Sequence, residues 1–276
     1  MLDLRARFSV DDMARMQLDN RNGFAPTFVP YLLDVFMPSQ YLSAGQRLLE
    51  RWDYQQHPDS AAAAYYNAVW RNTLELTFHD QLQESVWPDG GDRWFEVMRV
   101  LLADPDNSWW DNLDTETVVE SRDEILFEAM SLARDELVRT QARRPGEWTW
   151  GHHHRMDLEN QSLGQSDVGV VRWLLNRGGY QVGGGDSIVN ATGWTAPAGY
   201  AVDWAPSMRM VVSLEDLDDS RWINLTGVSG HAFHGNYVDQ TDLWVAGETL
   251  PWYFSRERLE ETAEDTLTLV QAAPSG

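Results

Sequence analysis

The sequence lacks two residue types that carry much of protein chemistry. It contains no Cys, which excludes disulfide bonds, thiolate metal sites and a cysteine nucleophile. It also contains no Lys, because all 21 basic side chains are Arg. The absence of Lys excludes Schiff-base catalysis, attachment of pyridoxal phosphate, a phosphate-loop lysine and a Ser–Lys dyad.

Long apolar runs and positive charge are also scarce. No stretch approaches the roughly 18 consecutive apolar residues of a membrane span, and residues 1–8 lack the apolar segment of a secretory signal. The formal net charge is −22, which opposes binding to nucleic acid and to anionic lipid. We therefore expect neither nucleic acid nor a membrane as a partner.

Glycine divides the chain into two parts of different backbone style. Residues 1–145 contain 4 of the 20 glycines, and residues 146–276 contain the other 16. The first part predicts helices, because Ser9, Ser60 and Ser121 each stand as an N-cap before apolar residues at helical spacing.

The second part predicts strands joined by turns. Residues 207–214 alternate between apolar and polar side chains, and residues 221–225 follow after an acidic turn. Two shorter strands, at 180–182 and 187–189, flank a glycine cluster at 183–185. That cluster lacks the Lys of a phosphate loop, so we interpret it as a tight crossing of two backbones.

These patterns predict an α+β fold with a helical first half. Its regions are a helical region over 1–145, a β-rich region over 146–254, and a C-terminal helix and tail over 255–276. We expect the three regions to form one structural unit.

Three neighbouring histidines are candidates for a metal site. On a strand, His152 and His154 would share a face and could bind a metal together with a carboxylate such as Asp157. The spacing of a recognised zinc motif is absent, and hydrogen-bonded neutral imidazoles are a simpler interpretation. We expect no metal and no cofactor.

A second candidate is a partial nucleophile elbow. Ser229 lies two residues after Gly227, but His231 stands where the pattern needs a second Gly. A triad of Ser229 with His231 or His234 and Asp239 is chemically conceivable. A turn between two strands explains the same residues more simply.

An ordered series of motifs in the second half resembles the penicillin acylase (penicillin amidase) family of N-terminal-nucleophile hydrolases. The first half agrees through Asp11-Asp12-Met13, Gln17-Leu18-Asp19 and the apolar run at 30–33, so the resemblance covers residues 8–254. The motifs of the second half are, in order, Trp150-Gly151 with His154, Gly184-Gly185-Asp186, Val189-Asn190-Ala191, Ser207-x-Arg209-x-Val211-Val212, Gly227-x-Ser229-Gly230, Tyr237-x-Asp239-Gln240, and Trp244 with Gly247.

The resemblance implies a fold, a reaction and a set of positions. It implies that the strands complete an αββα sandwich, in an enzyme that cleaves linear amides such as the acyl side chains of β-lactams or N-acyl compounds. It also implies pocket or structural roles for eight residues. They are His152, His154, Asp186, Asn190, Arg209, Tyr237, Asp239 and Gln240. The family has Ser and then His-Tyr in the last motif, where this chain has His234 and then Asn236-Tyr237.

The family's catalytic residues precede the matched region. Such enzymes expose a Ser at the N-terminus of the large subunit, and its α-amino group acts as the base. Met1 cannot be that nucleophile. The resemblance therefore implies that this chain is the C-terminal part of a large subunit, that its partners are an upstream acylase segment and a small amide substrate, and that it holds none of the catalytic set. It further implies a periplasmic or secreted enzyme.

Two alternatives remain open beside this hypothesis. The chain could be a stand-alone, non-catalytic protein that binds acyl or aromatic ligands through its Trp-rich surface. It could also be an autonomous hydrolase based on Ser229 or on the pair His152 and His154. Under the first hypothesis we expect the isolated chain to expose apolar faces and to self-associate.

Overall fold

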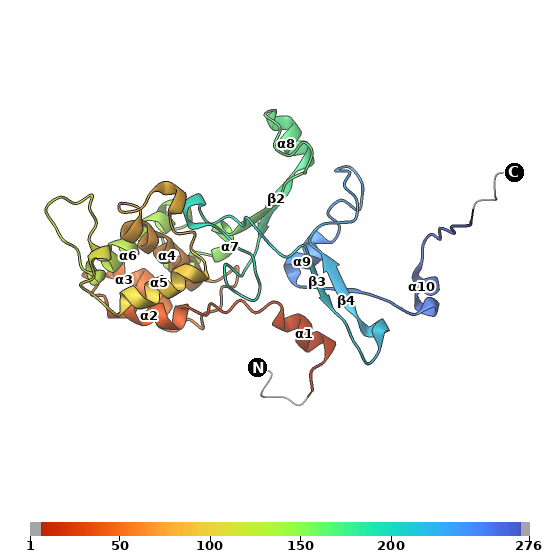
Figure 1. The fold of residues 1–276 in the computed structure, drawn as a ribbon, viewed down its shortest axis with the longest axis horizontal. Helices are drawn as coiled ribbons and strands as arrows, with labels where there is room; N and C mark the ends of the chain where they lie inside the picture. The colour runs from red at the N-terminus through yellow and green to blue at the C-terminus, as the bar shows by residue number, and fades with distance from the viewer. Residues whose placement is uncertain (1–6, 272–276) are drawn as a thin grey trace.

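A computed structural model describes residues 7–271 of the chain and shows a mixed fold of helices and short strands (Figure 1). Residues 1–6 and the expected frayed tail at 272–276 lie outside the described residues. The helices are α1 (Val10–Met16), α2 (Ala25–Asp34), α3 (Gln40–Leu49), α4 (Ala61–Phe78), α5 (Asp92–Leu102), α6 (Arg122–Thr140), α7 (Trp150–His153), α8 (Gly169–Leu175), α9 (Thr241–Ala246) and α10 (Arg256–Thr262). The strands are β1 (Arg155–Leu158), β2 (Arg177–Gln181), β3 (Met208–Val211), β4 (Arg221–Asn224) and β5 (Leu250–Pro251).

The two halves of the sequence form two regions of the molecule. Figure 1 shows α2 to α6 gathered on one side and β3, β4 and α9 on the other, with α8 at the tip of an arm between them. The fold class predicted from sequence, a helical first half followed by strands, is confirmed. None of the helices within residues 7–271 combines the length and the apolarity needed to cross a bilayer.

Helix α4 is the centre of the helical region. Fourteen of its eighteen residues are buried, and it packs along α6. The sequence predicts one apolar stripe through Tyr66, Trp70 and Leu74, and all three are buried. The helix is nevertheless covered on nearly all sides, which places it in the interior of the region.

The buried polar side chains of α4 find hydrogen-bond acceptors on their own preceding turn. The amide of Asn67 donates to Ala63 O at 2.9 Å, and the hydroxyl of Thr73 donates to Val69 O at 2.8 Å. Asn72 and Thr77 likewise donate to the carbonyl four residues earlier, Ala68 O and Thr73 O. Each polar group is therefore satisfied inside the core, as buried hydrogen-bonding groups require.

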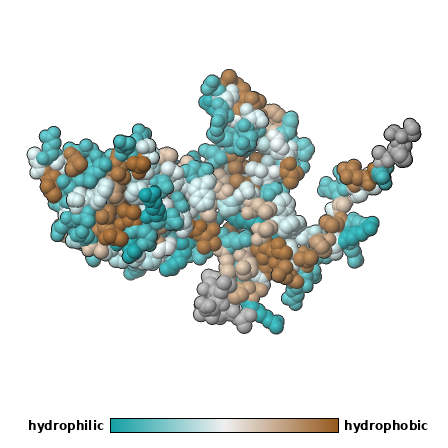
Figure 2. Space-filling model, in the orientation of Figure 1, coloured by the Kyte–Doolittle hydropathy of each residue, from teal (hydrophilic) through white to brown (hydrophobic). Residues whose placement is uncertain are grey.

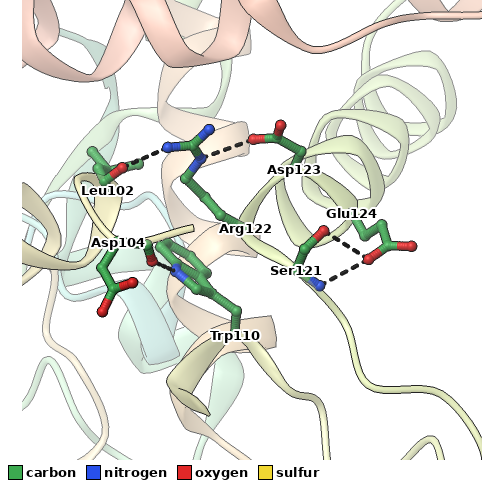
Figure 3. A network of polar contacts seen from close by, with 7 residues as sticks. All are labelled: Leu102, Asp104, Trp110, Ser121, Arg122, Asp123 and Glu124. Atoms are coloured by element: carbon green, nitrogen blue, oxygen red, sulfur yellow. Dashed lines mark hydrogen bonds and ion pairs between the residues drawn. The ribbon is translucent and has the colours of Figure 1, made fainter. Parts of the chain in front are cut away.

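Polar contacts fix the start of α6 against α5 (Figure 3). Ser121 and Glu124 form the predicted capping box, in which the Glu124 carboxylate accepts from both the amide and the hydroxyl of Ser121. Arg122 donates to Leu102 O, the last residue of α5, at 2.7 Å and pairs with Asp123 at 2.8 Å. The predicted caps at Ser9 and Ser60 are also confirmed.

The strands form two small antiparallel sheets. Strands β1 and β2 pair with Met156 opposite Tyr180, and the second sheet has the order β3-β4-β5 with Met210 opposite Trp222. The strands predicted at 207–214 and 221–225 are confirmed in their central residues.

Three local expectations are wrong. Residues 187–189 form a turn and a bend instead of a strand, because Ser187 has φ +55°, outside the extended region. Helical spacing from Ile125 and Ala129 predicts that Leu132 lies on the buried face of α6, but it is exposed. The apolar pattern of Leu259 and Leu267 predicts a C-terminal helix that reaches Leu267, but the helix ends at Thr262. None of its residues is buried to stabilise a longer one.

Candidate functional site

A chain of hydrogen bonds crosses the junction between the helical and the strand regions. The amide of Asn190 donates to the carbonyl oxygen of the Asn20 side chain at 2.8 Å, and Asn20 contacts the Nδ1 atom of His57 at 2.9 Å. On the other side, the guanidinium of Arg209 donates to Asn190 Oδ1 at 2.8 Å. Asn190 therefore joins a segment near the N-terminus to strand β3.

Arg209 is buried and lies over an aromatic ring. Its guanidinium carbon lies 3.7 Å from the ring centroid of Trp244, and its Nη1 atom donates to Trp244 O at 2.8 Å. Burial lowers the pKa of Arg209 to about 10, so the side chain remains charged at neutral pH. A desolvated cation held by a ring face and two oxygen acceptors fixes α9 against β3.

His154 is fully buried next to this chain. Its Nδ1 atom lies 2.7 Å from Tyr200 O, which can only accept, so Nδ1 carries the proton. Nε2 lies 3.1 Å from the hydroxyl of Thr192, and the ring stacks on Trp150 at 4.4 Å. Burial lowers the pKa of His154 to about 4, although the hydrogen bonds oppose this shift.

The expected metal-binding face is not formed. His152 belongs to the short helix α7 and lines an open cavity, whereas His154 follows α7 and points into the core. The strand begins only at Arg155, because the amides of Trp150 and Gly151 bond to Ser60 O and Pro58 O and bend the chain there. Within residues 7–271 no group of three or more His, Asp or Glu side chains is arranged to hold a metal ion.

The glycine cluster makes the close crossing that the sequence predicts. Gly184 has φ +90°, and a Cβ atom there would overlap Asn190 O. Its amide donates to Gln56 O at 2.9 Å, which brings the cluster against the segment leading to α4. Only Gly fits a positive φ with a backbone on each side.

Asp186 follows this cluster and is half-buried. It lines a cavity of about 10 Å³, room for about one water molecule, together with Asn22, Gln56 and Asn67. The pKa of Asp186 is raised by burial and, to a smaller extent, by the nearby carboxylates of Asp89 and Asp92. In the part of the chain that the structure describes, the Oε1 atom of Gln56 is buried without a hydrogen-bond partner.

Ser229 lines a larger cavity of about 370 Å³, together with Asn160 and Tyr237. Its hydroxyl accepts from the backbone amide of His231 at 3.2 Å. The hydroxyl of Tyr237 donates to Leu175 O at 2.9 Å and accepts from Asn160 at 3.2 Å.

The other proposed triad residues are engaged in the local turn. The Nδ1 atoms of His231 and His234 accept backbone amides, and the carboxylate of Asp239 accepts from the side chain of Asn236 at 2.7 Å. Over residues 7–271 no hydrogen bond joins the Ser229 hydroxyl to an imidazole ring, or an imidazole ring to Asp239. The triad stays a hypothesis.

Gln240 connects two elements of the strand region. It is buried at the start of α9, and its Oε1 atom accepts from the amide of Asn224 at 2.9 Å. This bond ties α9 to the end of β4. The structure thus brings His154, Asn190 and Arg209 together at the junction, whereas Gln240, Tyr237 and Asp239 lie in the strand region.

The sequence predictions missed Asn20, Gln56 and Thr192, which complete the junction. Each is an uncharged polar residue, a type that is common in turns and on surfaces. Its identity therefore does not indicate a buried role. The motif Gln17-Leu18-Asp19 is adjacent to Asn20 and was the nearest signal in the sequence.

Comparison with known proteins identifies relatives that act on acyl compounds. The family model described as penicillin amidase matches residues 1–261. The chain is 27% identical to penicillin acylase 2 proenzyme from Pseudomonas sp. (strain SE83), over 96% of this chain and 34% of that protein. It is 25% identical to the acyl-homoserine lactone acylase QuiP from Pseudomonas aeruginosa, over 81% of this chain and 28% of that protein.

A solved structure supports the fold. A thermostable penicillin G acylase from Alcaligenes faecalis superposes with a TM-score of 0.57 at 15% identity, over 99% of this chain and 51% of that chain. The chain spans about a third of the length of the curated relatives that it matches. On the family match, which extends over nearly the whole sequence, this chain belongs to the penicillin amidase family.

Proposed function

We propose that this chain is the C-terminal part of the large subunit of an acylase that hydrolyses linear amides. An upstream segment would supply the nucleophilic Ser at the N-terminus of that subunit, together with the oxyanion donors. The proposal includes a periplasmic or secreted location. The chain's own contribution would be the helical region, the strands and the wall of the acyl pocket.

One observation carries the proposal. The family model matches residues 1–261, but the matched region is only 34% of one curated relative and 28% of another. The names of these relatives, a penicillin acylase and an acyl-homoserine lactone acylase, support an N-acyl compound as substrate. The apolar strand surface described below is consistent with contact to further protein.

The first test is the DNA upstream of the codon for Met1. We expect an open frame that enters without a stop codon and encodes a segment beginning with Ser after a processing site. A stop codon in frame, next to a ribosome-binding site, would contradict the proposal.

The second test is catalytic. The product of the whole frame should release a chromogenic amine from an acyl anilide, and the 276-residue chain alone should not. Ser229→Ala should leave the activity of the whole product unchanged, as should the control Ser162→Ala, which changes another Ser of the same cavity. Turnover by the chain alone that Ser229→Ala abolishes would establish the triad instead.

A further inference from the structure

An open cavity of about 510 Å³ lies where α6, α7 and β1 meet the loop at 196–201. Its lining includes Glu136 and Thr140 from α6, His152 and His153 from α7, Arg155 from β1, and Tyr200 from the loop. Because these residues come from four segments, the fold itself assembles the cavity. Charged groups of both signs line it.

The cation of this cavity has no partner in the described chain. Arg155 is part of β1, and its backbone pairs with Gln181 of β2. Over residues 7–271, its guanidinium makes no hydrogen bond or ion pair, and its Nε atom is buried without a partner. A partly desolvated guanidinium without an acceptor is costly, which a bound carboxylate would relieve.

The anion of the cavity also lacks a charged partner within the described residues. The carboxylate of Glu136 accepts from Tyr200 at 3.0 Å and from Asn72 at 3.4 Å, both neutral donors. Among residues 7–271 no Arg or His forms an ion pair with Glu136. The nearby Arg71 lies over the Tyr200 ring and pairs with Glu75 at 3.9 Å.

Aromatic rings line the cavity together with the two charged groups. The rings of His153 and Tyr200 stack with centroids 5.1 Å apart, and the ring of His152 lies 5.5 Å from that of His153. Burial lowers the pKa of His153 to about 4, so this ring is neutral at pH 7. A neutral stacked pair offers a flat surface to an aromatic or apolar side chain.

We propose that this cavity binds a small zwitterion, a free amino acid or a dipeptide with an aromatic side chain. Its carboxylate pairs with Arg155, its ammonium group pairs with Glu136, and its side chain lies on His153 and Tyr200. A simple anion would meet Glu136 in a chain of net charge −22, and a simple cation would meet Arg155. Only a ligand that carries both charges pairs both groups. This inference goes beyond the proposed hydrolysis and holds whichever Ser carries that reaction.

The test is a titration of the full chain observed by NMR at the imidazole protons of His152 and His153. The probes are L-phenylalanine and L-phenylalanylglycine, with N-acetyl-L-phenylalanine and L-phenylalaninamide as ligands that lack one charge each. We expect saturable shifts with at least one zwitterion, and affinities for both single-charge ligands weaker by about tenfold or more.

Two variants and their controls locate the binding. Arg155→Gln and Glu136→Gln should each weaken binding of the zwitterion by about tenfold or more. Glu136→Gln retains an oxygen that accepts from Tyr200, and Arg155→Gln removes no hydrogen bond, so both should fold, as near-UV circular dichroism would verify. The exposed pair Arg144 and Glu147 supplies the matched controls, Arg144→Gln and Glu147→Gln, which should leave the affinity unchanged.

Three results would overturn the inference. One is the absence of shifts with either zwitterion up to about 10 mM, which corresponds to no useful binding energy. Another is equal affinity for N-acetyl-L-phenylalanine or L-phenylalaninamide, which would leave one charge without a role. The third is a pair of well-folded variants at Arg155 and Glu136 that bind as well as the controls.

Discussion

The helical and strand regions differ in how well they cover their apolar side chains. Among the described residues, one cluster of 33 buried apolar residues is centred on α4, whereas the cluster of the strand region contains Met156, Val182, Ile223 and Trp244. The strand region leaves Met208 and Met210 44% exposed and Leu214 90% exposed. Figure 2 shows apolar surface beside the β3–β4 hairpin and at the tip of the arm that carries α8.

The difference shows where each region obtains its stability. The helical region buries most of its large apolar side chains in one cluster, so we expect it to obtain its stability mainly from that core. The strand region has a smaller buried cluster, so we expect it to depend more on polar contacts at the junction such as those of Arg209 and Asn190. Its exposed sheet face offers further apolar area to a partner. Each prediction below tests one side of this contrast, in order of decreasing effect.

The largest loss should come from the core of the helical region. Trp70 is buried, and its indole nitrogen donates to Gly90 O at 3.1 Å. Trp70→Ala should lower the free energy of unfolding by about 3–5 kcal/mol, measured by urea denaturation. Trp252→Ala, at an exposed position of the strand region, is the control, and an equal loss there would remove the contrast.

Removal of Arg209 should uncouple the two regions. Arg209→Met leaves Asn190 Oδ1 without its donor and Trp244 O with the amide of Gly247 as its remaining donor, and should cost about 2–4 kcal/mol. We expect hydrogen exchange to accelerate in β3, β4 and α9 but not in α4. Uniform acceleration in both regions would contradict the separate roles assigned to them.

Acid should act through the buried His154. Its pKa falls from about 6.5 in the unfolded chain to about 4 in the folded one, so folding favours the neutral ring. The stabilisation is complete above pH 6.5, declines as the pH falls toward 4, and amounts to about 3 kcal/mol at most. His154→Gln should flatten the decline of unfolding free energy over that interval. The variant His153→Gln measures how much His153, whose pKa is also about 4, contributes to the same decline of unfolding free energy.

The cap of α4 should contribute more than the cap of α10. Ser60 accepts from the amide of Ala63 at 3.1 Å, and Ser60→Ala should cost about 1 kcal/mol. The equivalent change Ser255→Ala should cost little, because no residue of α10 is buried and the helix adds little to the folded state. Equal losses in thermal unfolding would show that α10 packs more firmly than described.

The smallest effect on stability should come from the exposed sheet face. The double variant Met208→Ser, Met210→Ser should change the free energy of unfolding by less than about 0.5 kcal/mol. It should reduce self-association of the isolated chain in sedimentation velocity, whereas Leu132→Ser, at an exposed position of α6, should not. Unchanged association would exclude this face as its cause.

Local chemistry made the helices and their caps predictable. A Ser N-cap bonds to residues of the first helical turn, so the whole signal lies within about four residues of sequence. For this reason Ser9, Ser60 and Ser121 located three helix starts correctly. Alternation located β3 for the same reason, because its period is set by the strand itself.

The junction could not be assembled from local patterns. Asn190 and Arg209 were identified through the family resemblance, but nothing near them in the sequence indicates that Asn20 completes the chain of hydrogen bonds. The separation of His152 from His154 also depends on bonds to Pro58 and Ser60, about ninety residues earlier. The sequence does not indicate the pair Arg155 and Glu136, because the two side chains come together only when the fold places them in one cavity.

The bond between Asn190 and Asn20 has a consequence for the order of events during synthesis. It joins residues 170 positions apart, and Gln17 reaches Met210 O across 193 positions. At roughly 5–20 residues added per second, the segment at 17–20 waits roughly 10–40 s for these partners to be made. Helix α4 and its neighbours can fold in that time, so residues 17–20 are made before these helices but are fixed in place after them.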